Sequence, residues 1–163
     1  MTRRVPQTRF VVAGPADPDK SDAVGEADMV RAEASGVRFL GLRHDVDRLY
    51  GGMDLYVLAS HREGFPRSAM EAAAMGLPLV ATDIRGCREV VTDGVNGRLT
   101  ALGDVAALAD AIAELASDAD LRRTMGEASR KKALAEFDQQ RVIDITLETY
   151  DRLLARRSAG RAA

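Results

Sequence analysis

The sequence has few residues of the kinds that form disulfides and metal sites. Its 163 residues include one cysteine, Cys87, and two widely separated histidines, His44 and His61. A single cysteine excludes an internal disulfide, and two lone histidines without paired thiols argue against a structural zinc site. We therefore assign no residue to metal binding and expect the chain to belong to a reducing compartment.

An excess of charge and a long apolar segment are lacking too. Lysine and arginine number 23 against 25 aspartates and glutamates, and the resulting net charge of -2 gives no overall attraction to nucleic acid or acidic lipid. The apolar runs are far shorter than the roughly 20 residues that cross a bilayer. The N-terminus lacks the apolar core of a signal peptide. We expect a cytoplasmic protein that has no nucleic-acid partner.

What the sequence does contain is an alternation of strand and helix patterns, with 46% apolar residues to form a core. Strands are predicted over residues 10–13, 37–41, 54–58, 77–82 and 98–100; helices are predicted over residues 21–34, 46–50, 68–76, 86–91 and 138–156, with two more starting at Asp104 and near Asp118. The alternation up to residue 100, followed by helices only, indicates an α/β fold. It is a Rossmann-like, doubly wound parallel sheet of about five strands with a helical C-terminus.

The most informative stretch is residues 60–82, where a strand ends, a loop turns and a helix begins. Ser68 followed by Glu71 has the spacing of a capping box, which predicts a helix N-terminus at Ser68. Ligands of open α/β sheets bind at the carboxyl ends of the strands, where helix N-termini offer N–H groups to anions. Glu63 and Glu71 both lie at that end. Two carboxylates beside a phosphate-binding N-terminus suit a nucleotide sugar, which has hydroxyl groups on either side of a diphosphate.

This stretch resembles the Glu-x7-Glu signature of retaining glycosyltransferases with the GT-B fold, of the broad family-4 type. Glu63 and Glu71 are its two glutamates. The further matches, in the family's order, are Val11-Val12-Ala13-Gly14-Pro15, Phe39-Leu40-Gly41, Asp54 to Leu58, Gly86 to Val91, and Asp93 to Gly97. The resemblance covers about residues 9 to 155 and identifies the chain as similar to the nucleotide-sugar-binding domain.

The resemblance also implies roles for residues of this stretch. Glu63 would contact the hydroxyls of the transferred sugar, and we expect it to orient the sugar and stabilise charge. The other expected donor-binding residues are Gly64, Phe65 and Pro66 in the loop, Arg67 and Ser68 facing the diphosphate, Glu71 at the ribose hydroxyls, and Leu42 and Arg43 bordering the nucleobase. Glu71 has a second interpretation as part of the capping box, and Arg67 as a solvated loop residue. His44, His61 and Cys87 are assigned no role.

By resemblance, the activity is retaining transfer of a hexose or N-acetylhexosamine from a nucleoside-diphosphate sugar. A UDP-sugar is the first expectation for the donor, and a polysaccharide or lipid-linked sugar for the acceptor. The family needs no metal or other cofactor, and the full enzyme could associate with the inner face of the plasma membrane. An alternative is a non-catalytic remnant that at most binds nucleotide. A dinucleotide-dependent oxidoreductase would need a Gly-x-Gly-x-x-Gly turn after a strand, which the sequence lacks.

The expected domain division is a disordered start (1–8), a partial nucleotide-sugar-binding domain (9–135), a terminal helix (136–157) and a disordered tail (158–163). In the family, an N-terminal domain and a central first strand precede the match, so we expect an incomplete fragment that needs the missing domain or a partner chain. The strands from Phe10 and Asp54 would then leave a gap or become direct neighbours. The terminal helix, which would return to the missing domain, should expose Val142, Ile145, Tyr150 and Leu153.

Overall fold

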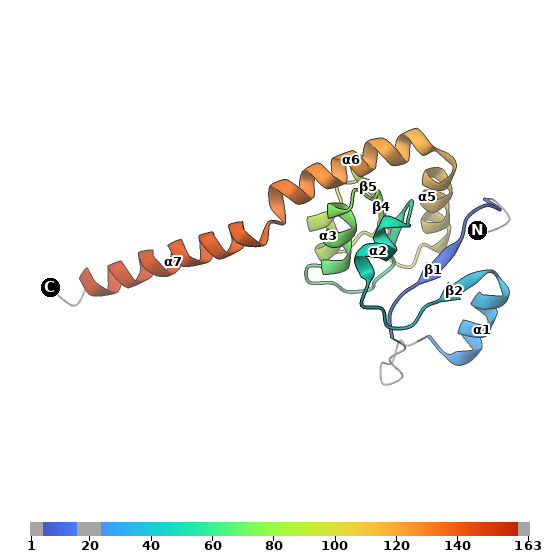
Figure 1. Ribbon diagram of the computed structural model, residues 1–163, viewed down its shortest axis with the longest axis horizontal. Helices are drawn as coiled ribbons and strands as arrows, with labels where there is room; N and C mark the ends of the chain where they lie inside the picture. The colour runs from blue at the N-terminus through green and yellow to red at the C-terminus, as the bar shows by residue number, and fades with distance from the viewer. Residues whose placement is uncertain (1–4, 16–23, 160–163) are drawn as a thin grey trace.

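The computed structural model describes residues 5–15 and 24–159. Its elements, in chain order, are β1 (Phe10–Val12), α1 (Glu26–Ala34), β2 (Val37–Phe39), α2 (Val46–Gly51), β3 (Tyr56–Leu58), α3 (Arg67–Ala74), β4 (Leu79–Thr82), α4 (Arg85–Val90), β5 (Gly97–Thr100), α5 (Val105–Ser117), α6 (Ala119–Glu136) and α7 (Gln139–Ala159). Strands and helices alternate up to β5, and helices alone follow. The predicted α/β fold with a helical C-terminus is confirmed (Figure 1).

The strand β4 is the centre of the fold. It pairs in parallel with β3 on one side and β5 on the other, with Leu79 opposite Tyr56 and Gly97. Side chains alternate across a strand, so Leu79 and Ala81 pack into the cluster formed with α3 and α4, whereas Val80 packs against α5. Figure 1 shows α3 and α5 on opposite sides of this sheet. Both faces are therefore covered, as in a doubly wound fold.

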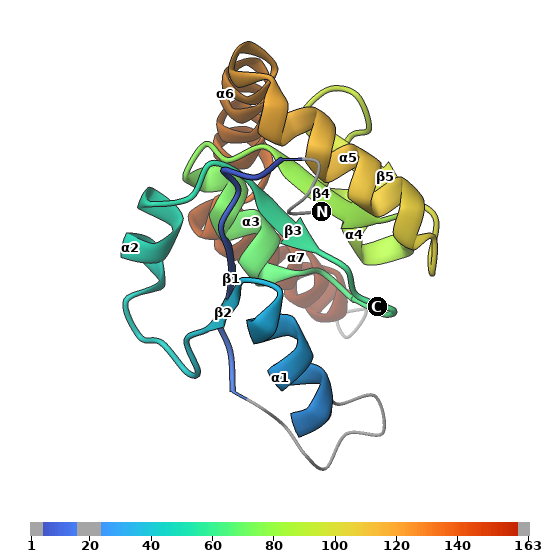
Figure 2. The same ribbon diagram turned by 90° about the vertical axis from the view of Figure 1, so that its right-hand side faces the viewer.

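The parallel pair β1–β2 forms a second ladder that is separate from β3–β4–β5 (Figure 2). Of the two arrangements expected for β1 and β3, the described residues show the gap rather than direct pairing. Phe10, like Leu55 and Val57, packs against the cluster that includes Val80 and α5. The rest of β1 is not buried, because Val11 and Val12 are 42% and 45% exposed. A strand paired on one edge alone has fewer neighbours to cover it.

The predicted starts of the later helices are confirmed at two aspartates. Asp104 accepts a hydrogen bond from the Ala107 N–H at 2.8 Å, and Asp118 accepts one from the Leu121 N–H at 2.9 Å. Both are N-caps that satisfy otherwise unpaired N–H groups of the first turn. Helix α1 begins at Glu26 with Gly25 as its N-cap. The expected cap at Ser21 lies outside the described residues.

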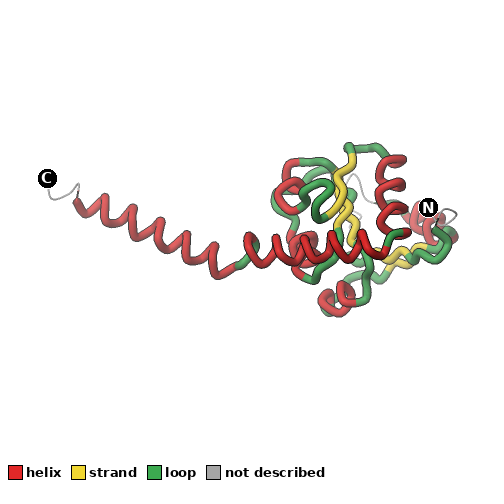
Figure 3. Tube along the Cα trace, turned by 90° about the horizontal axis from the view of Figure 1, so that it is seen from above, coloured by secondary structure: helices red, strands yellow, loops and turns green. Residues whose placement is uncertain are grey.

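Helix α7 extends away from the rest of the fold, nearly in line with α6 (Figures 1 and 3). The predicted exposure of its apolar face is confirmed, since Val142, Ile145, Tyr150 and Leu153 are each more than half exposed. Among the described residues, no helix is long and apolar enough to cross a bilayer. Residues 1–4 and 160–163 lie outside the described ranges, whereas residues 5–8 form a turn and α7 continues to Ala159. The domain division itself stays a prediction.

Candidate functional site

The loop between β3 and α3 rests directly on the start of α4. A Cβ atom on Gly86 would lie 2.5 Å from the carbonyl oxygen of Glu63 and 2.8 Å from that of Gly64. No side chain fits in so small a space, so Gly86 lets the backbone of α4 approach the loop. The position of Glu63 is thus set by backbone contact between two neighbouring βα units.

Glu63 is held by a hydroxyl group from its own loop. Ser60 Oγ donates a hydrogen bond to Glu63 Oε1 at 2.7 Å. Burial raises the pKa of the Cys87 thiol, and the negative charge of Glu63 raises it further. The carboxylate therefore has one oxygen fixed by Ser60 and one available to a ligand.

The predicted capping box at Ser68 was wrong. Helix α3 begins at Arg67 with Pro66 as its N-cap, and no side chain caps it. Ser68 lies inside the first turn, where its hydroxyl accepts a hydrogen bond from the Tyr56 hydroxyl at 2.7 Å. Glu71 is directed to Tyr50, whose hydroxyl lies 3.2 Å from Glu71 Oε2. A tertiary partner has displaced the local capping interaction in both cases, and the cap interpretation of Glu71 is excluded in this structure.

The first turn of α3 consequently offers N–H groups to a ligand. The first hydrogen bond within the helix runs from Met70 N–H to Pro66 C=O at 3.1 Å. The N–H groups of the three preceding residues, Arg67, Ser68 and Ala69, have no acceptor within the helix. Together with the helix dipole, such groups favour an anion such as a phosphate.

The half-buried Tyr56 lies between the loop and the first turn of α3. Burial raises its pKa, and the charges of Glu63 and Glu71 raise it further. Its hydroxyl donates to Ser68 Oγ in that turn, and the hydroxyl of the neighbouring Tyr50 lies 3.2 Å from Glu71 Oε2. The structure therefore brings the two predicted glutamates and the helix N-terminus into one neighbourhood.

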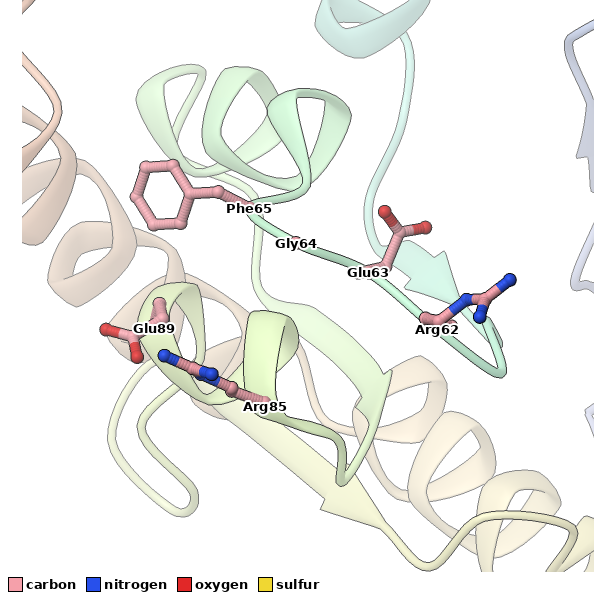
Figure 4. A pocket seen from close by; sticks show the side chains of 6 residues that line it. All are labelled: Arg62, Glu63, Gly64, Phe65, Arg85 and Glu89. Carbon is pink, nitrogen blue, oxygen red and sulfur yellow. The ribbon is translucent and has the colours of Figure 1, made fainter.

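A hollow of about 800 Å³ opens beside this loop (Figure 4). Its lining residues are Arg62, Glu63, Gly64, Phe65, Arg85 and Glu89. Figure 4 shows Arg85 and Glu89 rising from α4 on one side of the loop, whereas the Glu63 carboxylate points away from them. Phe65 turns towards Phe137, with ring centroids 5.8 Å apart. Two arginines and two glutamates thus line the hollow, with Arg85 and Glu89 on one side of the loop and the Glu63 carboxylate directed to the other.

The remaining predicted site residues lie outside this hollow. Pro66 is buried and Arg67 is exposed at the start of α3. Leu42 is 62% exposed before α2. Arg43 holds Asp45 through two hydrogen bonds of 2.8 and 2.6 Å, so its guanidinium is engaged within the loop. The structure therefore groups Glu63, Gly64 and Phe65 in the hollow but places Leu42 and Arg43 on another segment.

Sequence reasoning missed six residues that form or support the site: Tyr50, Tyr56, Ser60, Arg62, Arg85 and Glu89. Glu89 lies within the matched stretch Gly86 to Val91 and Arg85 directly precedes it, which was a usable signal. The tyrosines had none, because their partners are distant in the sequence. In the described residues, no three His, Cys, Asp or Glu side chains gather as a metal-binding group.

The sequence is similar to those of known glycosyltransferases. The sequence profile of the family "Glycosyl transferases group 1" matches residues 1–118. A Campylobacter jejuni N,N'-diacetylbacillosaminyl-diphospho-undecaprenol alpha-1,3-N-acetylgalactosaminyltransferase is 30% identical over 91% of the chain, and a Mycobacterium tuberculosis glycogen synthase is 33% identical over 92%. The chain spans 38% and 36% of the lengths of these two relatives.

Solved structures give the same result. Sucrose-phosphate synthase from Thermosynechococcus elongatus superposes with a TM-score of 0.80 at 28% identity, covering 93% of this chain and 40% of its own. Anabaena HepE in complex with UDP superposes with a TM-score of 0.78 at 31% identity, covering 92% of this chain and 42% of its own. The chain therefore belongs to the glycosyl transferases group 1 family and has the fold of the GT-B enzymes.

Proposed function

We propose that the chain binds a nucleoside-diphosphate sugar, with a UDP-sugar as the preferred donor, for retaining transfer of a hexose or N-acetylhexosamine. The observation that carries this proposal is the grouping of Glu63, Glu71 and the uncapped first turn of α3 around Tyr56. The diphosphate would accept hydrogen bonds from the N–H groups of that turn. Anabaena HepE, which superposes on this chain, was solved with UDP.

In this proposal the two glutamates have different tasks. Glu71 accepts hydrogen bonds from the ribose hydroxyls, and Glu63 orients the transferred sugar and stabilises the charge that develops at its anomeric carbon. The helix N-terminus and Arg67 offset the charge of the leaving diphosphate, so transfer needs no metal ion. The sugar keeps its anomeric configuration because the acceptor attacks the face from which the diphosphate leaves.

The acceptor and the cellular place are also part of the proposal. A polysaccharide or lipid-linked acceptor fits the Campylobacter relative, whose name includes an undecaprenol-linked sugar. The exposed apolar face of α7 supports a further domain or partner chain that completes the enzyme at the cytoplasmic face of the plasma membrane. Without that part we expect the 163-residue chain to bind donor but not to transfer sugar.

Calorimetric titration with UDP, UDP-glucose and UDP-N-acetylglucosamine tests the proposal, with and without EDTA. Glu71→Gln should weaken binding of all three by about 10-fold or more, because a hydrogen bond to a charged group contributes about 1.5–3 kcal/mol. Glu63→Gln should weaken the two sugar nucleotides but not UDP. Glu148→Gln, on the exposed part of α7, is the matched control. Absence of binding by the unmodified chain, or an equal loss in the Glu148→Gln control, would contradict the proposal.

A further inference from the structure

Two tyrosines from different elements meet at the first turn of α3. The Tyr50 hydroxyl, on α2, lies 3.2 Å from Glu71 Oε2 and 3.2 Å from the Ser68 carbonyl oxygen. The Tyr56 hydroxyl, on β3, donates to Ser68 Oγ at 2.7 Å. The two rings pack edge to face with centroids 6.0 Å apart. The pair thus fixes the helix start, but only Tyr50 reaches the carboxylate of Glu71.

The contact with Glu71 differs from an ordinary packing contact. Tyr50 is 7% exposed, so its hydroxyl occupies a fixed position, whereas Glu71 is an exposed residue with several rotatable bonds. A hydroxyl has one proton to donate, and a carboxylate is a stronger acceptor than a carbonyl group. The hydrogen bond therefore restrains Glu71 Oε2, and it leaves the second lone pair of Oε2 and both lone pairs of Oε1 for a ligand.

The tyrosine also stays a donor over the whole working range of pH. Burial raises the pKa of Tyr50, and the negative charge of Glu71 raises it further. The phenol consequently stays protonated, and able to donate, at neutral pH and well into the alkaline range. If Tyr50 only anchored the start of α3, a hydrogen bond from its hydroxyl to the Ser68 carbonyl oxygen would be enough. Its contact with Glu71 Oε2 therefore needs another explanation.

We propose that Tyr50 is a positioning residue: it orients the Glu71 carboxylate so that this carboxylate accepts hydrogen bonds from both ribose hydroxyls of the donor. The inference rests on the proposed function, in which Glu71 binds the ribose. It predicts that Tyr50 controls the preference for a ribonucleotide over a 2′-deoxyribonucleotide. Tyr150, which is exposed on α7 away from this turn, should leave that preference unchanged when it is replaced.

The test measures affinities for UDP and 2′-deoxy-UDP by calorimetry. The unmodified chain should prefer UDP by about 10-fold, the effect of one hydrogen bond to a charged acceptor. Tyr50→Phe keeps the ring and should reduce the preference to about 2-fold or less. Tyr150→Phe, on the exposed face of α7, is the control and should keep it. In the double variant with Glu71→Gln, Tyr50→Phe should cause no further loss, because both substitutions remove the same interaction.

The outcomes separate this inference from the proposed function. If the unmodified chain does not bind UDP, both are overturned. If it prefers UDP and Tyr50→Phe keeps the full preference, the inference alone is overturned. If Tyr50→Phe does not fold, the contact is tested in the unmodified protein by NMR. Exchanging the Tyr50 hydroxyl proton for deuterium should shift the resonance of the Glu71 carboxyl carbon, and the absence of a shift would contradict the contact.

Discussion

Phe65 and Phe137 pack edge to face, with ring centroids 5.8 Å apart and ring planes at 83°. Phe65 belongs to the loop of the candidate site, and Phe137 ends α6 immediately before α7. The contact joins the donor loop to the junction from which α7 extends. The position of α7 is thereby linked to the conformation of the loop that carries Glu63.

The first prediction concerns this aromatic pair. Phe137→Ala should lower the affinity for a UDP-sugar by about 3-fold to 10-fold, because an aromatic pair contributes about 0.5–1.5 kcal/mol beyond its buried area. Affinity for UDP should change less, since its proposed contacts are Glu71 and the α3 N-terminus, whereas Phe137 pairs with Phe65 of the loop. Calorimetry with both ligands checks this result. Leu134→Ala, an exposed neighbour on α6, is the control. Unchanged affinity for the sugar nucleotide would show that the loop does not depend on the pair.

The second prediction concerns Gly86. Gly86→Ala places a methyl group against the Glu63 carbonyl oxygen, so either the loop or α4 must move. We expect a loss of about 1–3 kcal/mol in the free energy of unfolding, the usual effect of overpacking, together with weaker binding of UDP-sugars. Gly51→Ala is the matched control, because a Cβ at Gly51 meets open space. Chemical denaturation of the two variants compares them, and equal stability would contradict the close approach.

Much of the fold could be predicted from local pattern. The strand β4 is short, apolar and bounded by Gly76 and a loop, and the caps at Asp104 and Asp118 satisfy N–H groups in their own helices. Each of these signals involves neighbouring residues, so the sequence displays it directly. The start of α3 was misplaced because Ser68 bonds to Tyr56, twelve residues earlier, instead of capping its own helix.

Only part of the candidate site could be predicted, because the rest depends on contacts between residues that are distant in the sequence. Glu63 and Glu71 are separated by a fixed spacing in one loop and helix, which the sequence shows. Tyr50 reaches Glu71 across 21 positions, and this contact depends on how α2 packs against α3. No periodicity encodes such packing. The residues that orient a carboxylate are therefore harder to predict than the carboxylate itself.

The third prediction concerns the exposed face of α7. Leu147→Ala and Ile145→Ala should change the free energy of unfolding of the chain by less than about 0.5 kcal/mol, the usual range for surface substitutions. Leu115→Ala, at a fully buried position of α5, is the contrast and should lower it by about 2–5 kcal/mol. Urea unfolding measures all three. A large loss at Ile145 or Leu147 would show that this face is covered in the isolated chain.

The fourth prediction concerns pH and the ion pair between β5 and α5. Arg98 donates two hydrogen bonds, of 2.8 and 2.6 Å, to the Glu114 carboxylate, and they lower the pKa of Glu114 below its ordinary value of 4.5. A lowered folded pKa means that the pair adds stability above the ordinary value and loses it as pH falls through the folded value. The contribution should be below about 1 kcal/mol, because both side chains are partly exposed to solvent.

Urea unfolding of the unmodified chain and of Glu114→Gln at pH 7 and pH 3 measures this contribution. The difference between the two proteins should be present at pH 7 and smaller at pH 3. The Glu148→Gln variant, at an exposed position of α7, serves as the control for the substitution itself. A difference that grows on acidification would have the wrong sign for a carboxylate stabilised by Arg98.

The last prediction concerns the two separate ladders. All four residues of β4 are buried and three of them, Leu79 to Ala81, pair on both sides, whereas β1 pairs with β2 alone and exposes Val11 and Val12. Regions with little apolar burial open at a lower free energy than the core does. Amide hydrogen exchange should therefore be at least about tenfold faster in residues 10–12 and 37–39 than in residues 79–82, which corresponds to about 1.4 kcal/mol.

Mass spectrometry of peptides from these segments measures the exchange rates. Added UDP should slow exchange at the start of α3 without removing the difference between the two ladders. Equal protection of both ladders would mean that they open as one cooperative unit. The shared packing of Phe10, Leu55 and Val57 against one cluster would then be the contact that couples them.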